Sequence, residues 1–407
     1  MPQREIVGQI LPLFSAFVFV LGTVVGSFLN VVVWRLPRGE SLSHPGSHCP
    51  KCGHAIRPWE NIPIVSWLAL RARCSQCRLP ISMRYPLVEL ANGLLFLVLW
   101  WRLWQSSMPL SSLWGYLFLG SALLAASLID IEHFLIPDAI TFTGMGVAAL
   151  LAGFFPETHV GNGLTGLPGG EQLITTTVCH GLATVSGVGA TSPRLTALFD
   201  VALGMLVGYA MLRLLLEAGQ RLWGQARERR REPVSARISA TGVSIGEDDL
   251  DAAWEDLLVR PGDVFLCRAT TLSAPGWEPP ADAAPVEIRV TRSRLFIGNL
   301  ERPLAAVETM SLELVSWEYP RDVMGHGDLK LLALIGAFMG PDATVFVLMW
   351  GAFLGCAWGI GRGALNPPQR REPLPFGPFL AVGALLWTLF GETLVRWYGD
   401  LLAGRAA

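Results

Sequence analysis

Long apolar stretches alternate with polar segments along this chain, and the pattern predicts helices that cross a membrane. Stretches long enough to span roughly 30 Å of hydrocarbon lie at 10–34, 87–105, 112–130, 139–155, 199–219, 329–340, 342–361 and 377–397. The step at Gly340-Pro341 either separates two short spans or kinks one long helix. The first stretch is too long for a signal-peptide core and is expected to be retained. We therefore expect an all-α polytopic membrane protein with about eight transmembrane helices.

Composition supports a membrane protein and excludes several other classes. The chain has 407 residues, of which 51% are hydrophobic and only 16% are charged, against about 25% charged in an ordinary globular protein. A wholly soluble enzyme, a disordered chain and a small disulfide-rich scaffold do not have this composition. The net charge of −2 gives no general reason to bind nucleic acid.

The positive charges are unevenly distributed, and this predicts a topology. The segment 35–86 carries eight Lys and Arg, 106–111 carries none, and 156–198 carries only Arg194. Cytoplasmic loops are the ones enriched in Lys and Arg. We therefore expect 35–86 and 220–328 to lie in the cytoplasm, and both termini to lie on the other side of the membrane.

Two of the polar segments are long. Residues 156–198 are rich in Gly, Thr and Ser and are expected to form an extracytoplasmic loop with little structure. Residues 222–318 contain an acidic patch and two alternating runs, VEIRV at 286–290 and SLELV at 311–315. Such alternation predicts strands. This segment is therefore expected to be a cytoplasmic insert with β content, whose role and partner the sequence leaves open.

Four cysteines form the most specific local motif. Cys49 and Cys52 enclose two residues, and so do Cys74 and Cys77 after 21 intervening positions. This spacing is close to that of zinc ribbons, in which four thiolates close a tetrahedral site. Two disulfides are the alternative, but they rarely persist in the cytoplasm. We expect a structural zinc ion in a small ribbon-like loop.

Other residues could compete for the metal or for cysteine chemistry. His44, His48 and His54 lie in the same segment, although four sulfur ligands suffice. The remaining cysteines are scattered and are expected to act as small apolar residues; they are Cys179, Cys267 and Cys356.

Two carboxylates stand at ends of predicted spans on the same side of the membrane. Asp130 ends the third span and Asp328 begins the sixth. Placing a carboxylate in a membrane costs free energy, so such a residue is expected to have a function. Two close carboxylates can share a proton, so that one activates water while the other polarises a carbonyl. Gly325 and Gly327, on either side of His326, would allow a substrate strand to approach.

Simpler interpretations of the acidic residues remain open. Asp138 follows Pro137 and is expected to cap a helix, as is Asp200, and Asp328 alone could also be a cap. Glu132 and His133 are expected in a solvated turn. A transporter or a zinc-stabilised scaffold with an aspartate proton relay is an alternative of another class.

Several longer stretches together resemble one family. They are GSFLNVVVWRLPRG at 26–39, CPKCGHAIRPWENIPIVSWLALRARCSQC at 49–77, ISMRYPLVELANG at 81–93, LIDIEHFLIPD at 128–138 and GHGDLKLLALIGAFMG at 325–340. In these stretches the chain resembles the type IV prepilin peptidases of the bacterial inner membrane. These are GxGD-type membrane aspartyl proteases that also act as N-methyltransferases.

The resemblance implies roles for individual residues. Asp130 and Asp328 match the catalytic pair, and the four cysteines match a zinc-binding loop associated with methylation. The family cuts prepilins or pseudopilins after a glycine that ends a basic leader, then methylates the new N-terminus with S-adenosylmethionine. A position matching Gly93 is important for methylation, and nearby polar candidates for the cofactor site are Glu60, Asn61, Glu89 and Asn92. A peptidase without methyltransferase activity is the alternative within this family.

The expected organisation departs from the family in one respect. We divide the chain into a first span at 1–34, the zinc loop at 35–86, spans at 87–221, the insert at 222–318 and the GxGD segment at 319–407. The insert separates the two aspartates by 198 positions, more than the family usually does, which leaves specificity and regulation open.

Overall fold

The computed structural model divides into two compact units. One comprises Met1–Leu212 together with Gly325–Ala407, and the other is Arg213–Met324. The structure describes residues 2–105, 109–158, 193–223, 225–246, 250–258, 263–273, 285–298, 300–320, 325–365 and 374–402. Most of the predicted loop 156–198, with Cys179, lies outside these ranges.

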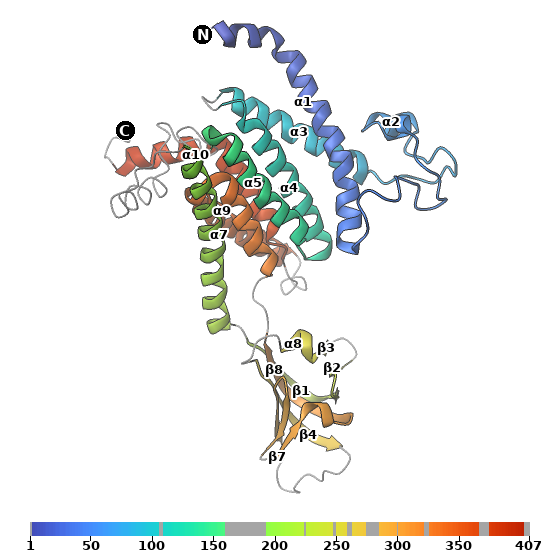
Figure 1. Ribbon diagram of the computed structural model, residues 1–407. Coiled ribbons are helices and arrows are strands. Elements are labelled where there is room, and N and C mark those ends of the chain that lie inside the picture. Colours follow the sequence, from blue (N-terminus) through green and yellow to red (C-terminus); the bar gives the residue numbers. More distant parts are fainter. Residues whose placement is uncertain are drawn as a thin grey trace. The chain divides into compact units, whose positions relative to one another are not determined.

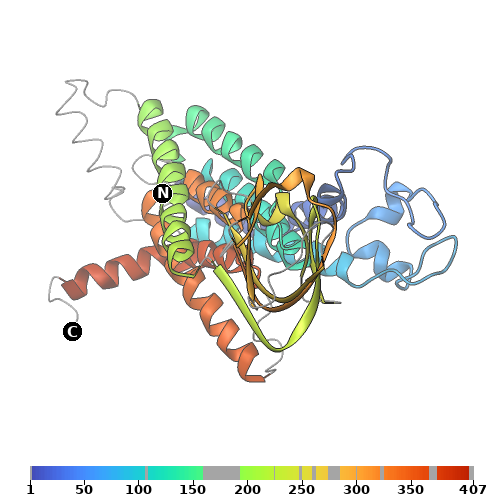
Figure 2. The ribbon, with the colours of Figure 1, turned by 90° about the horizontal axis from the view of Figure 1, so that it is seen from below.

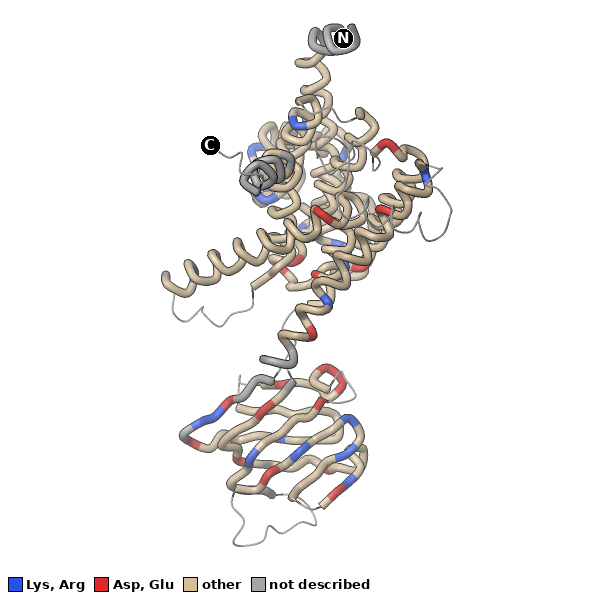
Figure 3. Tube along the Cα trace, turned by 90° about the vertical axis from the view of Figure 1, so that its left-hand side faces the viewer, with Lys and Arg blue, Asp and Glu red and all other residues tan. Residues whose placement is uncertain are grey.

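The first unit is built from helices (Figure 1). Its α-helices are α1 (Pro2–Arg35), α2 (Val65–Ala69), α3 (Arg84–Gln105), α4 (Ser112–His133), α5 (Asp138–Phe154), α7 (Pro193–Trp223, which continues into the second unit), α9 (His326–Leu365) and α10 (Gly377–Leu402). Short 3-10 helices are η1 (Leu36–Arg38), η2 (Pro58–Asn61) and η3 (Pro156–Thr158). The long helices carry few charged residues, whereas the strands of the second unit carry many (Figure 3). This contrast is the one the apolar stretches predict.

Five of the described helices are long and apolar enough to cross a membrane. They are Leu11–Arg38, Arg84–Gln105, Ser112–His133, Pro193–Gly219 and His326–Ala364. Two apolar helices are shorter, Asp138–Phe154 and Gly377–Gly391. The predicted count of eight is not confirmed. The sixth and seventh stretches both lie in α9, in which two helices meet at a break. Gly340 interrupts α9 with a φ of 79°, directly before Pro341, which has no N–H to donate.

Helices α1 and α3 pack very closely through small residues. A Cβ on Gly22 would lie 2.8 Å from the Gly93 Cα, and one on Gly26 would lie 2.8 Å from the Glu89 Cα. A Cβ on Gly93 would in turn lie 2.8 Å from side-chain atoms of Phe19 and Thr23. Close backbone contact of this kind is how helices associate in lipid. The α1–α3 pair therefore depends on these three glycines.

Helix α7 begins earlier than the sequence suggested, and this corrects one expectation. The helix starts at Pro193, so Asp200 lies inside it and is buried. Asp200 is therefore not an N-terminal cap. Further along α7, Gly204 meets the backbone of Gly336 on α9, where a Cβ on either residue would collide with the other's carbonyl group.

The second unit is an antiparallel sheet of eight strands. They are β1 (Gln225–Ile238), β2 (Gly242–Ile245), β3 (Leu250–Ala253), β4 (Phe265–Ser273), β5 (Val286–Val290), β6 (Arg294–Ile297), β7 (Leu300–Pro303) and β8 (Met310–Pro320), with α8 (Trp254–Leu257) and η4 (Leu304–Ala306). The strand order is β3-β2-β1-β8-β4-β5-β6-β7. Figure 2 shows the sheet strongly curled. VEIRV is β5 and SLELV lies in β8, so the predicted β content is confirmed.

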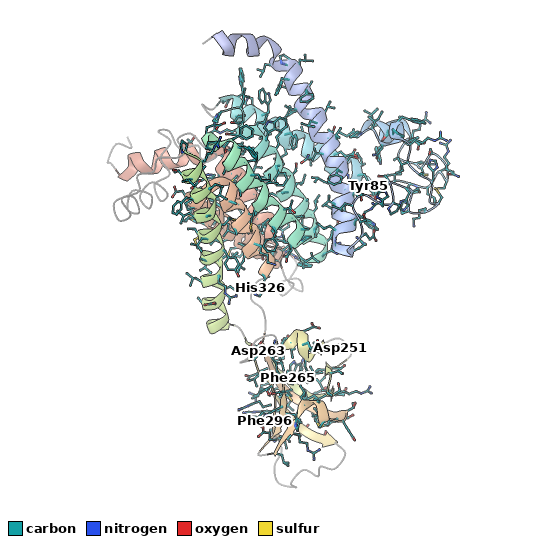
Figure 4. All side chains as sticks on the ribbon, in the orientation of Figure 1. Tyr85, Asp251, Asp263, Phe265, Phe296 and His326 are labelled. Carbon is teal, nitrogen blue, oxygen red and sulfur yellow. The ribbon has the colours of Figure 1, made fainter. Side chains whose placement is uncertain are left out.

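One face of the curled sheet encloses an apolar core. Phe265, Ile288, Leu314 and Trp317 are almost fully buried there, and Figure 4 marks Phe265 among the strands. Cys267 belongs to the same core, where burial raises the pKa of its thiol. It therefore behaves as the small apolar residue that the sequence predicted.

Candidate active site and metal centre

The four predicted metal ligands come together. The Sγ atoms of Cys49, Cys52, Cys74 and Cys77 all lie within 4.8 Å of one another. The Cys49–Cys77 and Cys52–Cys74 Sγ distances are 3.9 Å and 4.0 Å, and all four cysteines are free thiols. Tetrahedral ligands about 2.3 Å from a zinc ion stand about 3.8 Å apart. The cluster therefore fits zinc and differs from the two-disulfide alternative.

The two halves of the cluster have the same backbone fold. The Cys49 N–H donates to the His54 carbonyl and the Cys74 N–H donates to the Leu79 carbonyl. In each half the residue four positions after the first cysteine adopts a left-handed conformation, Gly53 with a φ of 71° and Arg78 with a φ of 60°. Each CxxC turn is thus formed by contacts between neighbours in sequence, and the pairing of the two turns completes the site.

The backbone of the turns also affects the pKa values of the cysteine thiols, and these values influence cation binding. Backbone N–H groups of Cys77 and Gln76 donate to the Cys74 sulfur, which lowers the pKa of this thiol to about 6. The backbone N–H of His54 lowers the pKa of Cys52, but desolvation and the neighbouring thiols raise it to about 11. The backbone N–H groups of the second turn therefore favour the thiolate form of Cys74, and a bound cation would favour the thiolate forms of the others.

Glu60, a predicted cofactor candidate, links the two turns. Its carboxylate accepts the Arg57 N–H at 3.0 Å and lies 3.2 Å from His54 Nε2. Ser75, within the second turn, also hydrogen-bonds to it, and together these donors hold the pKa of Glu60 below its usual value. His54 is thus a neighbour of Glu60, and in the described residues the metal-binding cluster consists of the four cysteines alone.

Glu89 attaches the loop 35–86 to α3. Its Oε2 accepts the Ile64 N–H at 2.7 Å, and Ser27 of α1 also hydrogen-bonds to it. Ile64 has a φ of 62°, a conformation that costs free energy for a β-branched residue. The strained turn at Ile64 is therefore kept in place by a buried carboxylate.

The other cofactor candidates also take part in helix packing. Asn92 is fully buried; its Nδ2 donates to the Gly22 carbonyl at 2.7 Å, and its Oδ1 accepts from Ser121 of α4. Gly93 is covered by α1, as described above, and only Asn61 is exposed. Glu60, Glu89 and Asn92 thus make hydrogen bonds within the chain, and these contacts give them a place in the packing of the loop and the helices.

Asp130 lies in the last turn of α4. The helix ends because Phe134 adopts a left-handed conformation and its N–H donates to the Asp130 carbonyl, a common form of helix termination. The Asp130 side chain is 5% exposed, and its Oδ2 accepts the N–H of Gly377, the first residue of α10, at 2.9 Å. One oxygen of this carboxylate is therefore oriented by the backbone of another helix.

Asp328 lies in the first turn of α9, after His326, which Figure 4 marks at the start of this helix. Its side chain is 7% exposed, and its buried Oδ1 has no hydrogen-bond partner among the described residues. The charge of Asp130 acts on the Asp328 carboxyl group. The structure thus brings the two predicted aspartates near each other, and one of their oxygen atoms is free to bind a further group.

Ile136, in the connection between α4 and α5, joins the helix ends that carry the aspartates. A Cβ on Gly327 would lie 2.9 Å from the Ile136 Cβ, and a Cβ on Gly377 would lie 2.8 Å from Asp130 Oδ2 and 3.1 Å from Ile136 Cδ1. Gly325 is less crowded, since its Cβ would lie 3.7 Å from Asp328 Oδ2. The sequence analysis did not identify Ile136 or Gly377 as site residues. The only sequence signal was the position of Gly377 at the start of the last apolar stretch.

Two expectations about neighbouring residues were wrong. Asp138 makes no side-chain cap, because Pro137 holds the cap position of α5; its carboxylate instead pairs with Lys330 of α9. Glu132 and His133 belong to α4 rather than to a turn. Glu132 pairs with Arg84 at 2.7 Å, and His133 Nε2 is buried. These contacts tie α3 and α5 to the helices that carry the aspartates.

A separate cavity lies in the second unit. It has a volume of about 390 Å³ and is lined by residues of β1, β2 and β3, including Arg237, Ser244 and Asp251. It contains neither aspartate of the pair and none of the four cysteines.

Family models match two regions of the chain. Residues 20–103 match the bacterial peptidase A24 N-terminal domain, and residues 291–360 match the type IV leader peptidase family. The first region contains the cysteine cluster and the second contains Asp328. No solved structure matches the chain.

Curated proteins named "Prepilin leader peptidase/N-methyltransferase" are similar to this chain. One from Burkholderia pseudomallei is 42% identical over 401 residues, which cover 92% of this chain and 85% of the relative. One from Aeromonas hydrophila is 26% identical, covering 95% and 94%. One from Myxococcus xanthus is 46% identical over 153 residues, covering 37% of this chain and 44% of the relative. Some matches, as in the last case, thus span less than half of the relative's length.

Proposed function

The chain belongs to the family of prepilin leader peptidases/N-methyltransferases, and on that premise we propose that it removes the leader of prepilins or pseudopilins and methylates the new N-terminus. The observation that carries the peptidase half is the meeting of Asp130 and Asp328, buried at the ends of two long apolar helices. Burial of a carboxylate costs free energy, and proteins retain such residues where they serve a function.

In the proposed reaction the two aspartates share one proton. The ionised carboxylate takes a proton from water, whose oxygen attacks the scissile carbonyl carbon, while the protonated carboxyl group donates a hydrogen bond to the carbonyl oxygen. The C–N bond then breaks, and a proton passes to the released amine. Asp130 has one oxygen held by the Gly377 N–H, whereas the buried Oδ1 of Asp328 has no hydrogen-bond partner in the described part of the chain. This asymmetry supports Asp130 as the fixed member and Asp328 as the one that first contacts water or substrate.

The cysteine cluster is proposed to hold a structural zinc ion. Zinc with four thiolate ligands has no open position, so when bound it contributes folding energy to the loop 35–86. Through Ile64 and Glu89 the loop is connected to α3, and through Asn92 α3 is connected to α4, the helix whose last turn carries Asp130. The zinc loop and the peptidase helices thus form one connected structure.

Methyl transfer is proposed from the family, and the methyl donor is S-adenosylmethionine. The residues first considered for its site use their polar atoms inside the chain, as described above, so we derive no step through it. We propose an indirect role in methylation for Glu60, Glu89 and Gly93, because they keep the loop, α1 and α3 together.

The proposed site of action is the cytoplasmic face of a bacterial inner membrane, with both termini on the opposite side. The excess of Lys and Arg in 35–86 supports this orientation. The basic leader of a prepilin lies in the cytoplasm and its apolar helix in the membrane, so the scissile bond lies at this interface. Both aspartates are at helix ends, as the orientation requires.

The test uses the full chain, purified in lipid, with a prepilin and S-adenosylmethionine. Mass spectrometry distinguishes the intact prepilin, the cleaved product and the cleaved product that is heavier by one methyl group. The proposal predicts cleavage followed by methylation. Cleavage without methylation would support the peptidase alternative. If the prepilin stays intact with this chain but is cleaved by an active relative under the same conditions, the proposal as a whole is contradicted.

A further inference from the structure

The zinc loop carries an exposed apolar face. Trp59, Ile62, Val65 and Leu68 are exposed to 62%, 47%, 59% and 62%, and they follow one another at intervals of three residues. Val65 and Leu68 lie on one side of α2, whereas Trp67 faces the loop and its Nε1 donates to the Ile81 carbonyl. We call these four exposed residues the apolar loop face. Four large apolar side chains exposed within one short segment indicate that this segment contacts a partner.

The described helices of the first unit leave this face exposed. Figures 1 and 2 both show α2 and its flanking loop beside α1, extending away from the other helices. The partner must therefore come from outside the described part of this unit.

The charge of the loop limits the choice of partner. Residues 35–86 contain eight Lys and Arg but only two acidic residues, Glu40 and Glu60, a net charge of +6. A basic prepilin leader would be repelled by this charge. Anionic lipid head groups would be attracted, because basic segments next to a membrane bind anionic lipid surfaces.

The ends of the loop keep it at a membrane surface. Its two ends continue directly into the candidate spans Leu11–Arg38 and Arg84–Gln105. At the end of the first span, the Arg38 guanidinium lies 3.8 Å over the Trp34 ring, and in the loop Arg57 lies 5.6 Å from the Trp59 ring. Trp and Arg side chains of this kind are typical of the interface between lipid and water. The same pair of residue types thus occurs at the span end and on the apolar loop face.

We propose that the apolar loop face lies on the membrane, with Trp59, Ile62, Val65 and Leu68 inserted among acyl chains and the surrounding arginines on anionic head groups. The zinc loop is then a peripheral membrane-binding element between two spans, and not a domain in the aqueous phase. This inference concerns lipid contact and does not depend on the proposed enzymatic function.

The experiment maps lipid contact on the full chain in lipid nanodiscs. A photoreactive amino acid replaces Val65 or Leu68, and Lys51, an exposed residue of the first CxxC turn, is the matched control. Retention of zinc shows that each variant keeps its loop, and Ile62 on the same face replaces any position at which zinc is lost. We expect lipid adducts at 65 and 68 to be at least about tenfold more frequent than at 51, and to decrease when phosphatidylglycerol is replaced by phosphatidylcholine.

Three outcomes would overturn the proposal. Adducts at 65 and 68 that are no more frequent than at 51 would show that the face does not contact lipid. Adducts with a second copy of the chain would make the face a protein interface. Equal yields in anionic and neutral nanodiscs would remove the role of the arginines.

Discussion

The metal centre and the aspartate pair are assembled in different ways, although both lie in the same unit. The four cysteines fall between positions 49 and 77, and each CxxC turn is closed by its own backbone hydrogen bonds. The aspartates are 198 positions apart and meet only because Ile136, Gly327 and Gly377 let three helix ends come together. The metal centre should therefore tolerate changes in the helices, and the aspartate pair should be sensitive to crowding at distant glycines.

The largest expected effect is loss of a catalytic carboxylate. Asp130→Asn and Asp328→Asn should each lower the rate of leader cleavage by about 10³-fold or more, since one amide cannot share a proton as a carboxylate does. Mass spectrometry of a co-expressed prepilin measures the change, and methylation should stop as well because no new N-terminus is released.

The control for this prediction is Asp138→Asn. It removes the charge of an exposed pair with Lys330, and such pairs contribute little, so cleavage should stay within a few-fold of the unmodified chain. Normal cleavage by either of the first two variants, at normal expression, would exclude the aspartate mechanism.

The next effect separates the two centres. The double variant Cys49→Ser/Cys52→Ser should lose the bound zinc, expected at about one ion per chain, and should reduce N-methylation by about tenfold or more while cleavage changes less, since metal supplies local folding energy. Cys356→Ser is the matched control, because Cys356 lies on α9 outside the cluster. Complete loss of cleavage in a stably inserted cysteine variant would mean that the zinc loop belongs to the peptidase site.

Crowding at the glycines tests the other half of the comparison. Gly327→Ala places a Cβ 2.9 Å from Ile136, and Gly377→Ala places one 2.8 Å from Asp130 Oδ2. Displacement of a catalytic group by a fraction of an ångström should reduce cleavage by about 10-fold to 100-fold and leave zinc content unchanged. Gly146→Ala on α5 is the control, because no atom lies within 4 Å of the added Cβ. Equal effects of Gly146→Ala and Gly327→Ala would show that Ile136 does not position the pair.

A moderate effect is expected where the loop joins α3. Glu89→Ala leaves the Ile64 N–H without its acceptor and should lower N-methylation by about tenfold, with zinc retained and cleavage less affected. Glu89→Gln keeps an acceptor oxygen and should restore most of the activity. Ile64→Gly removes the strain of the left-handed conformation and should partly rescue Glu89→Ala. If neither Glu89→Gln nor the added Ile64→Gly change restored methylation, Glu89 would have a role other than positioning the loop.

The smallest effect concerns Glu60. Its pKa is lowered below 4.5 by the Arg57 N–H, Ser75 and His54, so its contribution to loop stability is complete above that value and is lost as the pH falls through the lower folded-state pKa. Glu60→Gln should lower the urea concentration that unfolds the loop at pH 7, measured without zinc because acid also protonates the thiolates and releases the ion. The difference from the unmodified chain should disappear below the pKa of Glu60; a difference that persists there would contradict a role for the charge.

Local patterns in the sequence predicted local structure well. The CxxC spacing gave the metal cluster, and the alternating run VEIRV gave a strand, because both depend on neighbours in the chain. Helix boundaries were less predictable. Asp138 and Asp200 were both expected to be caps, but a proline holds the cap position before Asp138, and α7 begins seven residues before Asp200.

By itself the sequence determined that the chain is a membrane protein with a cysteine cluster and two aspartates at ends of spans, because hydropathy, spacing and charge are properties of consecutive residues. The tertiary structure alone decided that Asp130 receives the Gly377 N–H and that Glu89 holds the strained turn at Ile64. These features depend on contacts between segments far apart in the chain. The free energy of such contacts comes from close packing and from satisfying buried polar groups, and neither is visible in the order of the residues.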